Sequence, residues 1–211
     1  MEPRAQATPV IVLDAGKVLV DFDLARLFGE LSRRAGRAVG PPLPPAFARL
    51  LHDVEIGARP WTEIPPAVGD ALGIAVTAEE WRALWLGIFT GEVPGMRAAL
   101  AELKAGYTLV ALSNTSQVHW EHVVARYPVF GLLDGWVVSY AERAAKPDPA
   151  VYRAVMERWC GGGPPRFYTD DMPRFVEAAR ALGWDAEVFA GAGAFRRALA
   201  RRGLRARARI T

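Results

Sequence analysis

Residues 10–21 read VIVLDAGKVLVD, and this stretch decides the fold. Its first four residues form a short, fully apolar run that ends at Asp14. Such a run is typical of a central strand in a sheet that helices cover on both faces. We therefore expect a buried strand that carries an acidic side chain at its carboxyl end.

Outward from this strand, the hydrophobic pattern divides the chain into two parts. Residues 23–93 show helical spacing and no strand pattern, and Asp23 is suited to cap the first helix. From Pro94 onward the pattern changes, because predicted helices alternate with predicted strands. These strands are expected at residues 107–112, 136–139, 166–169 and 186–189.

Strands that alternate with helices indicate right-handed βαβ units and a parallel sheet. The helical stretch interrupts the alternation after a single strand, so it is best placed as an insertion over one edge of the sheet. The sequence predicts an α/β protein with a Rossmann-like core of residues 1–22 and 94–211. Residues 23–93 are predicted to form an all-helical cap subdomain.

The composition is typical of a folded, soluble protein. The chain is 51% hydrophobic and contains seven tryptophans. No apolar run approaches the ~20 residues that a transmembrane helix needs, and no export signal precedes the first strand. Cys160 is the only cysteine, which excludes an internal disulfide. We expect a cytoplasmic protein without a membrane partner.

The net charge of +3 does not by itself indicate a nucleic-acid partner. Seven arginines lie in residues 196–209, and without them the chain has 19 basic and 23 acidic residues, a net charge of −4. Phe195, Ala198 and Leu199 have helical spacing beside these arginines. A terminal helix with a solvated basic face is the favoured interpretation. We expect no nucleic-acid partner, and the pattern leaves the oligomeric state open.

Polar clusters follow several of the predicted strands. Each cluster alone has an ordinary explanation as a turn or a helix cap. In open parallel sheets, however, ligands bind beyond the carboxyl ends of the strands, so the clusters should meet at one edge. The clusters are Asp14 to Asp21, Ser113-Asn114-Thr115, Lys146-Pro147-Asp148-Pro149 and Asp170-Asp171.

Three carboxylates at one edge would raise one another's pKa values unless a cation lies among them. Mg²⁺ binds carboxylates, backbone carbonyls and phosphate oxygens, which matches Asp14, the Gly16 carbonyl and Asp170 together with a phosphorylated substrate. A lysine and a hydroxyl group would hold the remaining phosphate oxygens. Lys146 is one of only three lysines in the chain, so its position is informative.

The four clusters, in this order, resemble the four motifs of the haloacid dehalogenase superfamily with a helical C1-type cap. The resemblance covers nearly the whole chain. The first motif, with Gly16 two residues after the aspartate, is closest to the group that includes alpha-D-glucose-1-phosphate phosphatase. His119 and the cap sequence Glu55-Ile56-Gly57 are similar to that group as well.

The resemblance implies a phosphatase that hydrolyses a small phosphorylated metabolite through an aspartyl-phosphate on Asp14. It assigns Mg²⁺ to Asp14, the Gly16 carbonyl and Asp170, with Asp171 behind them or on a metal-bound water. It also implies that Ser113 and Asn114 bind the phosphoryl group, while Lys146 steadies both the nucleophile and the phosphate.

Gly16 departs from the usual phosphatase pattern, in which an aspartate at this position protonates the leaving oxygen. General acid catalysis typically contributes ~10²–10⁴-fold in rate. We therefore expect substrates whose leaving group needs little help, such as a sugar 1-phosphate, an acyl phosphate or an aryl phosphate. His119 is a candidate substitute acid, and Lys17 a candidate for extra positive charge. Arg143 stands where a glycine often precedes the catalytic lysine.

Two other functions stay open at this point. A metal-independent 2-haloacid dehalogenase uses the same aspartate on carbon and also lacks the acid at the position of Gly16, although the pair Asp170-Asp171 would repel its carboxylate substrate without a cation. A binding or regulatory protein could keep the fold without useful turnover, with the arginine-rich segment as its contact surface.

Overall fold

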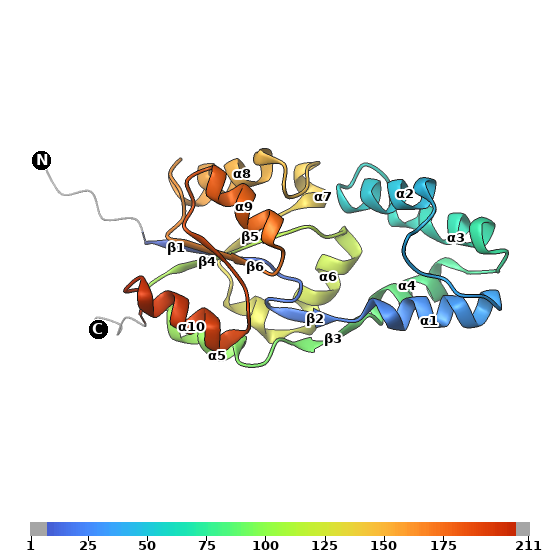
Figure 1. Ribbon diagram of the computed structural model, residues 1–211, viewed down its shortest axis with the longest axis horizontal. Helices are drawn as coiled ribbons and strands as arrows, with labels where there is room; N and C mark the ends of the chain where they lie inside the picture. The colour runs from blue at the N-terminus through green and yellow to red at the C-terminus, as the bar shows by residue number, and fades with distance from the viewer. Residues whose placement is uncertain (1–7, 206–211) are drawn as a thin grey trace, which may run out of the picture.

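The computed structural model describes residues 8–205, and a five-stranded parallel sheet forms its centre (Figure 1). The strand order is β5-β4-β1-β6-β7, so β1 lies in the middle, as expected for a short and fully apolar strand. This arrangement confirms the predicted α/β Rossmann-like class. The strands are β1 (Val10–Leu13), β4 (Thr108–Ser113), β5 (Gly135–Val138), β6 (Phe167–Asp170) and β7 (Ala186–Val188).

Helices cover both faces of this sheet. Successive residues of β1 point to opposite sides, so this strand contributes to two hydrophobic cores. Ile11 and Leu13 belong to one hydrophobic core, whereas Val10 and Val12 belong to the other. The first core is closed by α5 (Met96–Leu103), α6 (Gln117–Arg126), the 3-10 turn η2 (Pro128–Leu132) and α10 (Ala192–Arg201). The second core is closed by α8 (Pro149–Trp159) and α9 (Pro173–Ala181).

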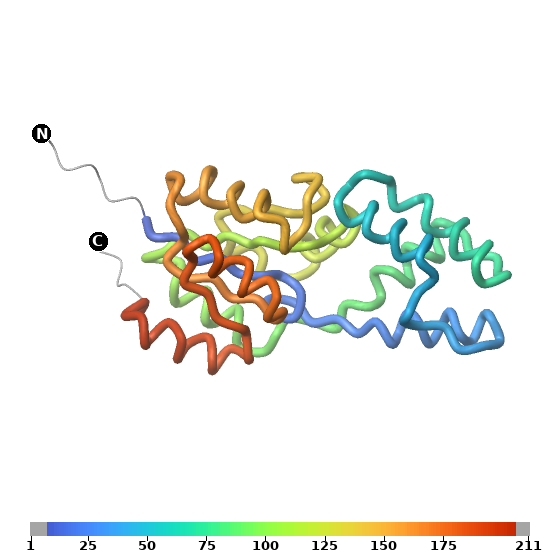
Figure 2. The backbone as a smooth tube through the Cα atoms, turned by 45° about the horizontal axis from the view of Figure 1, so that its top comes forward, coloured from blue at the N-terminus to red at the C-terminus, as the bar shows by residue number. Residues whose placement is uncertain are grey.

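Helices α1 to α4 lie together at one end of the sheet, apart from its covering layers (Figures 1 and 2). The side chain of Asp23 accepts a hydrogen bond from the first turn of α1, and Thr77 and Glu80 form a capping box at the start of α4. These helices enclose a hydrophobic core of their own that includes the fully buried Ile64 and Trp81. The elements are α1 (Leu24–Ala35), α2 (Pro45–Glu55), η1 (Trp61–Glu63), α3 (Ile64–Leu72) and α4 (Ala78–Leu86).

A two-stranded antiparallel ribbon joins these helices to the sheet. It consists of β2 (Val20–Phe22) and β3 (Phe89–Glu92). The expectation that residues 23–93 contain no strand was wrong for β3. This strand has only four residues, includes Gly91, and owes its hydrogen bonds to a partner far away in sequence, so its own residues give a weak signal. The proposed cap boundaries at residues 23 and 93 stay a prediction.

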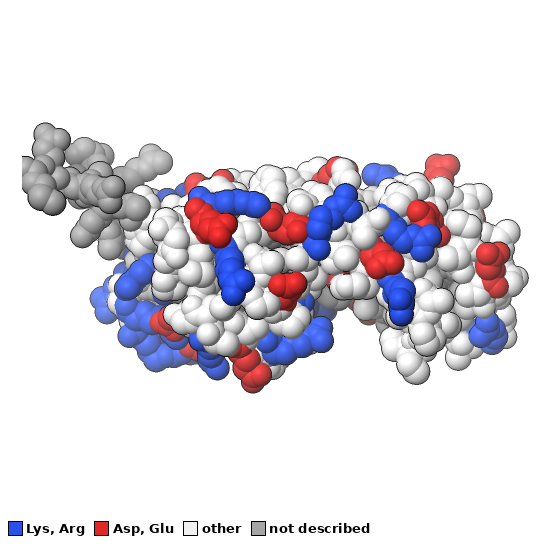
Figure 3. Space-filling model, turned by 90° about the horizontal axis from the view of Figure 1, so that it is seen from above, with Lys and Arg blue, Asp and Glu red and all other residues white. Residues whose placement is uncertain are grey.

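The terminal helix α10 buries Phe195, Ala198 and Leu199, as its spacing predicts. Two of its three arginines are paired, because Arg196 and Arg201 lie 2.6 Å and 2.7 Å from carboxylate oxygens of neighbouring elements, whereas Arg197 is exposed. Figure 3 shows acidic side chains interspersed with basic ones on the face seen from above. Arg207 and Arg209 lie outside the described residues. Within residues 8–205, no helix is long and apolar enough to cross a membrane.

The turn after α2 connects the helical part to the core. The hydroxyl group of Ser139, which begins α7 (Ser139–Glu142), lies 2.7 Å from the backbone oxygen of Glu55 and accepts a hydrogen bond from the Thr115 amide. The guanidinium group of Arg143 donates to the backbone oxygen of Gly57. Arg143 thus holds the turn of residues 55–57 against α7, although its own backbone has a positive φ of 57°.

Gly57→Ala should destabilise the protein more than Gly73→Ala. Both glycines have positive φ, 67° and 69°, so alanine at either position costs about 1–2 kcal/mol. At Gly57 a Cβ atom would also lie 2.3 Å from the backbone oxygen of Tyr140, whereas nothing lies within 4 Å at Gly73. Urea unfolding should give a further loss of at least about 1 kcal/mol for Gly57→Ala. Equal losses would contradict a close docking of this turn.

Candidate active site

The predicted polar clusters converge at the carboxyl edge of the sheet. Asp14 follows β1, Ser113 ends β4 and Asp170 ends β6, and β1 pairs with both of the other strands. The Asp14 amide donates to the backbone oxygen of Thr169 at 2.9 Å, which continues the sheet pairing to the site itself. The register of the parallel strands therefore brings the side chains together, as the sequence predicted.

The Lys146 ammonium group lies at the centre of this edge and is almost fully buried. Its Nζ atom is 2.8 Å from Asp14 Oδ1, 2.6 Å from Asp170 Oδ2 and 2.9 Å from the backbone oxygen of Leu112. Burial alone would lower the pKa of Lys146, but the charges of Asp14 and Asp170 outweigh it and raise the pKa. Lys146 is therefore charged at neutral pH.

One ammonium group does not balance the acidic charge of this edge. Asp14, Asp170 and Asp171 each offer a carboxylate oxygen, and these oxygens lie within 4.8 Å of one another. Burial, together with the charge of Asp170, raises the pKa of Asp14 to about 7 despite the opposing effect of Lys146. Burial also raises the pKa of Asp171. Clustered carboxylate oxygens with excess negative charge fit a hard divalent cation. The Gly16 carbonyl stays a predicted fourth ligand.

Ser113 and Asn114 differ in what their side chains are free to do. The Ser113 hydroxyl group makes no hydrogen bond within residues 8–205, so it is available to a ligand. The Asn114 amide instead donates to the backbone oxygen of Lys146 at 3.0 Å and accepts from the Lys146 amide at 2.7 Å. Asn114 thus positions the backbone of Lys146, while its predicted contact with a phosphoryl group stays a prediction.

Two further candidates from the sequence have other roles. Lys17 donates to Asp21 at 2.5 Å and lies over the Phe22 ring. His119 stacks on the Trp85 ring at 4.7 Å, and its Nε2 atom is 3.0 Å from the Trp85 backbone oxygen. Burial lowers the pKa of His119 to about 4, so at neutral pH the ring is uncharged. It is not a proton donor to a leaving group under those conditions.

Sequence reasoning placed Tyr168 in the fourth motif but missed its role, which is to donate a hydrogen bond from its hydroxyl group to Asp170. Residues i and i+2 of a strand share a face, so the position of Tyr168 relative to Asp170 was a usable signal. It also missed the contact between Phe22 and Gly16. A Cβ atom at position 16 would lie 3.0 Å from the Phe22 ring, so an aspartate there would have to displace it.

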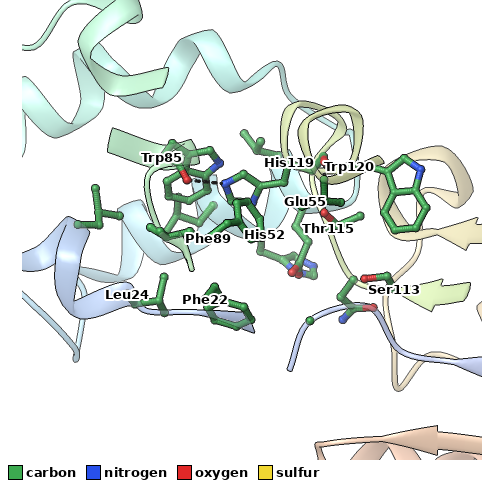
Figure 4. Close-up of a pocket in the computed structure, with 18 of the residues that line it drawn as sticks. Phe22, Leu24, His52, Glu55, Trp85, Phe89, Ser113, Thr115, His119 and Trp120 are labelled. Atoms are coloured by element: carbon green, nitrogen blue, oxygen red, sulfur yellow. Dashed lines mark hydrogen bonds and ion pairs between the residues drawn. The ribbon is translucent and has the colours of Figure 1, made fainter. Parts of the chain in front are cut away.

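A cavity of about 480 Å³ extends from this edge toward the inserted helices (Figure 4). Gly16, Ser113 and Asn114 line its core side, while residues of α1, α2 and α4 line the opposite side. Ligand pockets commonly have volumes of ~300–1,000 Å³. The candidate site therefore combines a charged, metal-competent edge with a partly open cavity large enough for a substrate.

The sequence pattern of the haloacid dehalogenase-like hydrolases matches residues 8–183. No curated protein matches the chain.

Several solved structures share this fold. The HAD family enzyme BT-2542 from Bacteroides thetaiotaomicron is 22% identical with a TM-score of 0.74, over 88% of this chain and 95% of that one. Its complex with magnesium and inorganic phosphate has also been solved, with a TM-score of 0.72. A HAD-like family hydrolase from Porphyromonas gingivalis is 21% identical with a TM-score of 0.75, over 92% and 98% of the two chains. The L-2-haloacid dehalogenase PA0810 is 22% identical with a TM-score of 0.61, over 88% and 86%.

Mg²⁺ should raise the melting temperature more at about pH 8 than at about pH 5.5. The folded-state pKa of Asp14, about 7, lies above the ordinary value of 3.8, so without metal its ionisation costs stability as pH rises through this window. Below pH 7 a proton competes with the ion for Asp14, and above it the ion relieves the repulsion. In Asp14→Asn the pH dependence of the Mg²⁺ effect should shrink. A larger effect at the lower pH would contradict the assignment of Asp14 to the metal.

Proposed function

We propose that this chain, which belongs to the haloacid dehalogenase-like hydrolases, is a Mg²⁺-dependent phosphatase for a small phosphorylated metabolite. The observation that carries the proposal is the convergence of Asp14, Asp170 and Asp171 around Lys146, beside the unpaired hydroxyl group of Ser113. A fixed nucleophile, excess acidic charge for a cation and free donors for phosphate oxygens are the parts that phosphoryl transfer requires. The magnesium and phosphate complex of BT-2542 supports this proposal.

In the proposed reaction a carboxylate oxygen of Asp14 attacks phosphorus. The bond between phosphorus and the leaving oxygen breaks, and its electron pair departs with that oxygen. Water then attacks the phosphorus of the aspartyl-phosphate, which releases inorganic phosphate and restores the carboxylate. Lys146 holds Asp14 Oδ1 at 2.8 Å and so orients the nucleophile, while Ser113 donates to a phosphoryl oxygen. Bound Mg²⁺ would supply positive charge that reduces the repulsion between Asp14 and the phosphate.

The similarity to an L-2-haloacid dehalogenase makes that reaction the main competing candidate. Asp170 is fully buried beside Asp14, and Asp171 adds a third carboxylate. Without a cation these groups would repel a carboxylate substrate, whereas with one they attract a phosphate ester. The acidic cluster therefore favours phosphate over haloacid as the substrate.

Phosphate and halide release by the wild type and by Asp14→Asn, with Mg²⁺ or with chelator, should separate the candidates. We expect phosphate release that needs Mg²⁺ and falls by at least about 10³-fold in Asp14→Asn, because the nucleophile is lost. Halide release in chelator would show a dehalogenase instead. Release of neither product would favour a binding protein.

Leaving-group chemistry should restrict the substrates of this phosphatase. Gly16 supplies no proton, and His119 is uncharged at neutral pH and engaged with the Trp85 backbone. With neither group as a donor, we expect the leaving oxygen to depart with little protonation, which suits an acyl phosphate, an aryl phosphate or a sugar 1-phosphate. Simple alkyl phosphates should be poor substrates.

Gly16→Asp combined with Phe22→Leu should raise turnover of a simple alkyl phosphate by at least about tenfold, since general acid catalysis typically contributes ~10²–10⁴-fold. Gly16→Asp alone should gain less, because the Phe22 ring would lie 3.0 Å from the new Cβ atom. Phe22→Leu alone is the control, and the gain of the double variant is measured relative to it because Phe22 also lines the cavity.

Glu55→Gln tests the restriction to good leaving groups, because Glu55 is the carboxyl group that the inserted helices contribute to the cavity lining. In Glu55→Gln the dependence of rate on leaving-group pKa should stay as in the wild type. A steeper dependence would make Glu55 the proton donor and overturn the restriction to good leaving groups.

A further inference from the structure

The cavity above the proposed catalytic edge is hydrophobic over most of its wall. The residues from the inserted helices and the adjoining β2–β3 ribbon include an unusual number of aromatic rings, among them two tryptophans whose centroids lie 5.1 Å apart. His119 adds an uncharged ring, stacked on Trp85 and crossed by Phe89 at 5.1 Å. The aromatic wall consists of Phe22, Phe28, Phe47, Trp85 and Phe89, and the fully buried Trp81 packs against Trp85.

Polar groups are scarce away from the catalytic end. Among the described residues of α1 to α4 that line the cavity, only His52 and Glu55 carry a charged or strongly polar side chain. Burial raises the pKa of the Glu55 carboxyl group although the charge of Lys146 opposes the shift, and Figure 4 shows Glu55 and His52 on the side of the cavity near Ser113. The indole nitrogens of Trp81 and Trp85 are buried from solvent, so they are not available to a ligand.

This lining is poorly suited to a sugar. Each hydroxyl group that leaves water without gaining a hydrogen bond costs free energy, and a sugar brings several of them into the space. An apolar group of similar size loses no hydrogen bonds there and gains contact with the aromatic rings. Among the leaving groups that can depart without a proton donor, the cavity therefore favours apolar groups over sugars.

We infer that the substrate is a phosphate ester with an apolar leaving group of aromatic size, such as an aryl phosphate. The inference rests on the proposed phosphatase function and deepens it. The apolar lining and the lack of a proton donor both favour such a group, because a phenolic oxygen has a pKa of about 10 and departs far more readily than an alkoxide. The phosphate lies at the charged edge with Lys146 and Ser113, and the aromatic group extends into the cavity between α1, α2 and α4.

Phenyl phosphate and 4-butylphenyl phosphate provide the test, because their leaving oxygens have nearly the same pKa and differ in apolar area. A buried methylene group is worth roughly fourfold in binding. We expect kcat/KM to be at least about tenfold higher for the butyl compound. Glucose 1-phosphate should be a worse substrate than either. Equal values for the two aryl esters, or a preference for the sugar phosphate, would overturn the inference.

Leu51→Gln tests the apolar lining of the cavity, and Leu72→Gln is its matched control. Both leucines are half-buried and pack on the same hydrophobic core, but only Leu51 lines the cavity. Leu51→Gln should reduce the preference for the butyl compound by about fivefold or more while hydrolysis of phenyl phosphate continues. Leu72→Gln should leave the preference unchanged. Equal changes in both variants would assign the effect to stability and contradict a role of the wall.

The outcomes also distinguish the inference from the function on which it rests. Phenyl phosphate hydrolysis that depends on Asp14, without a preference for the butyl compound, would refute the apolar leaving group alone. Absence of phosphate release from every ester tested would refute both the inference and the proposed phosphatase.

Discussion

The structure of the site depends on one buried charge, the ammonium group of Lys146. A buried charge costs several kcal/mol unless it is paired and hydrogen-bonded. Here its partners come from three adjacent strands, since Leu112 belongs to β4, Asp14 follows β1 and Asp170 ends β6. The strand order β4-β1-β6 is therefore needed to bring these partners around the ammonium group. Loss of both carboxylates would leave an uncompensated charge in the centre of the fold.

The same network fixes what each part of the molecule contributes. Asn114 holds the Lys146 backbone and Tyr168 bonds to Asp170, so the charged edge is rigid before any ligand binds. The turn that contains Glu55 is held by Ser139, which also bonds to the loop after β4. The sheet thus supplies preorganised charge, and the inserted helices supply the shape and polarity of the space above it. In the proposed enzyme the sheet edge performs the chemistry and the inserted helices shape the substrate space.

Much of this could be predicted from the sequence. Short apolar runs marked the strands, and the rule that parallel strands share a carboxyl edge brought Asp14, Lys146 and Asp170 together. The strand β3 could not be predicted, because it depends on pairing with β2 far away in sequence. The uncharged state of His119 results from burial, which no motif encodes. The cavity wall was also unpredictable, because apolar residues at helical spacing look the same whether they pack together or enclose a space.

Phe22 connects the two features that define the proposed specificity. Its ring packs over Gly16 so closely that a larger side chain at that position would displace it, and the same ring lines the aromatic cavity. The Phe22 ring thus takes part in both features, since it lies close to Gly16 and belongs to the apolar lining. In the proposed substrate one group meets both conditions, because a phenol departs without a proton and its ring packs on an apolar surface. The two conditions therefore meet at Phe22, where the chain leaves the sheet for the inserted helices.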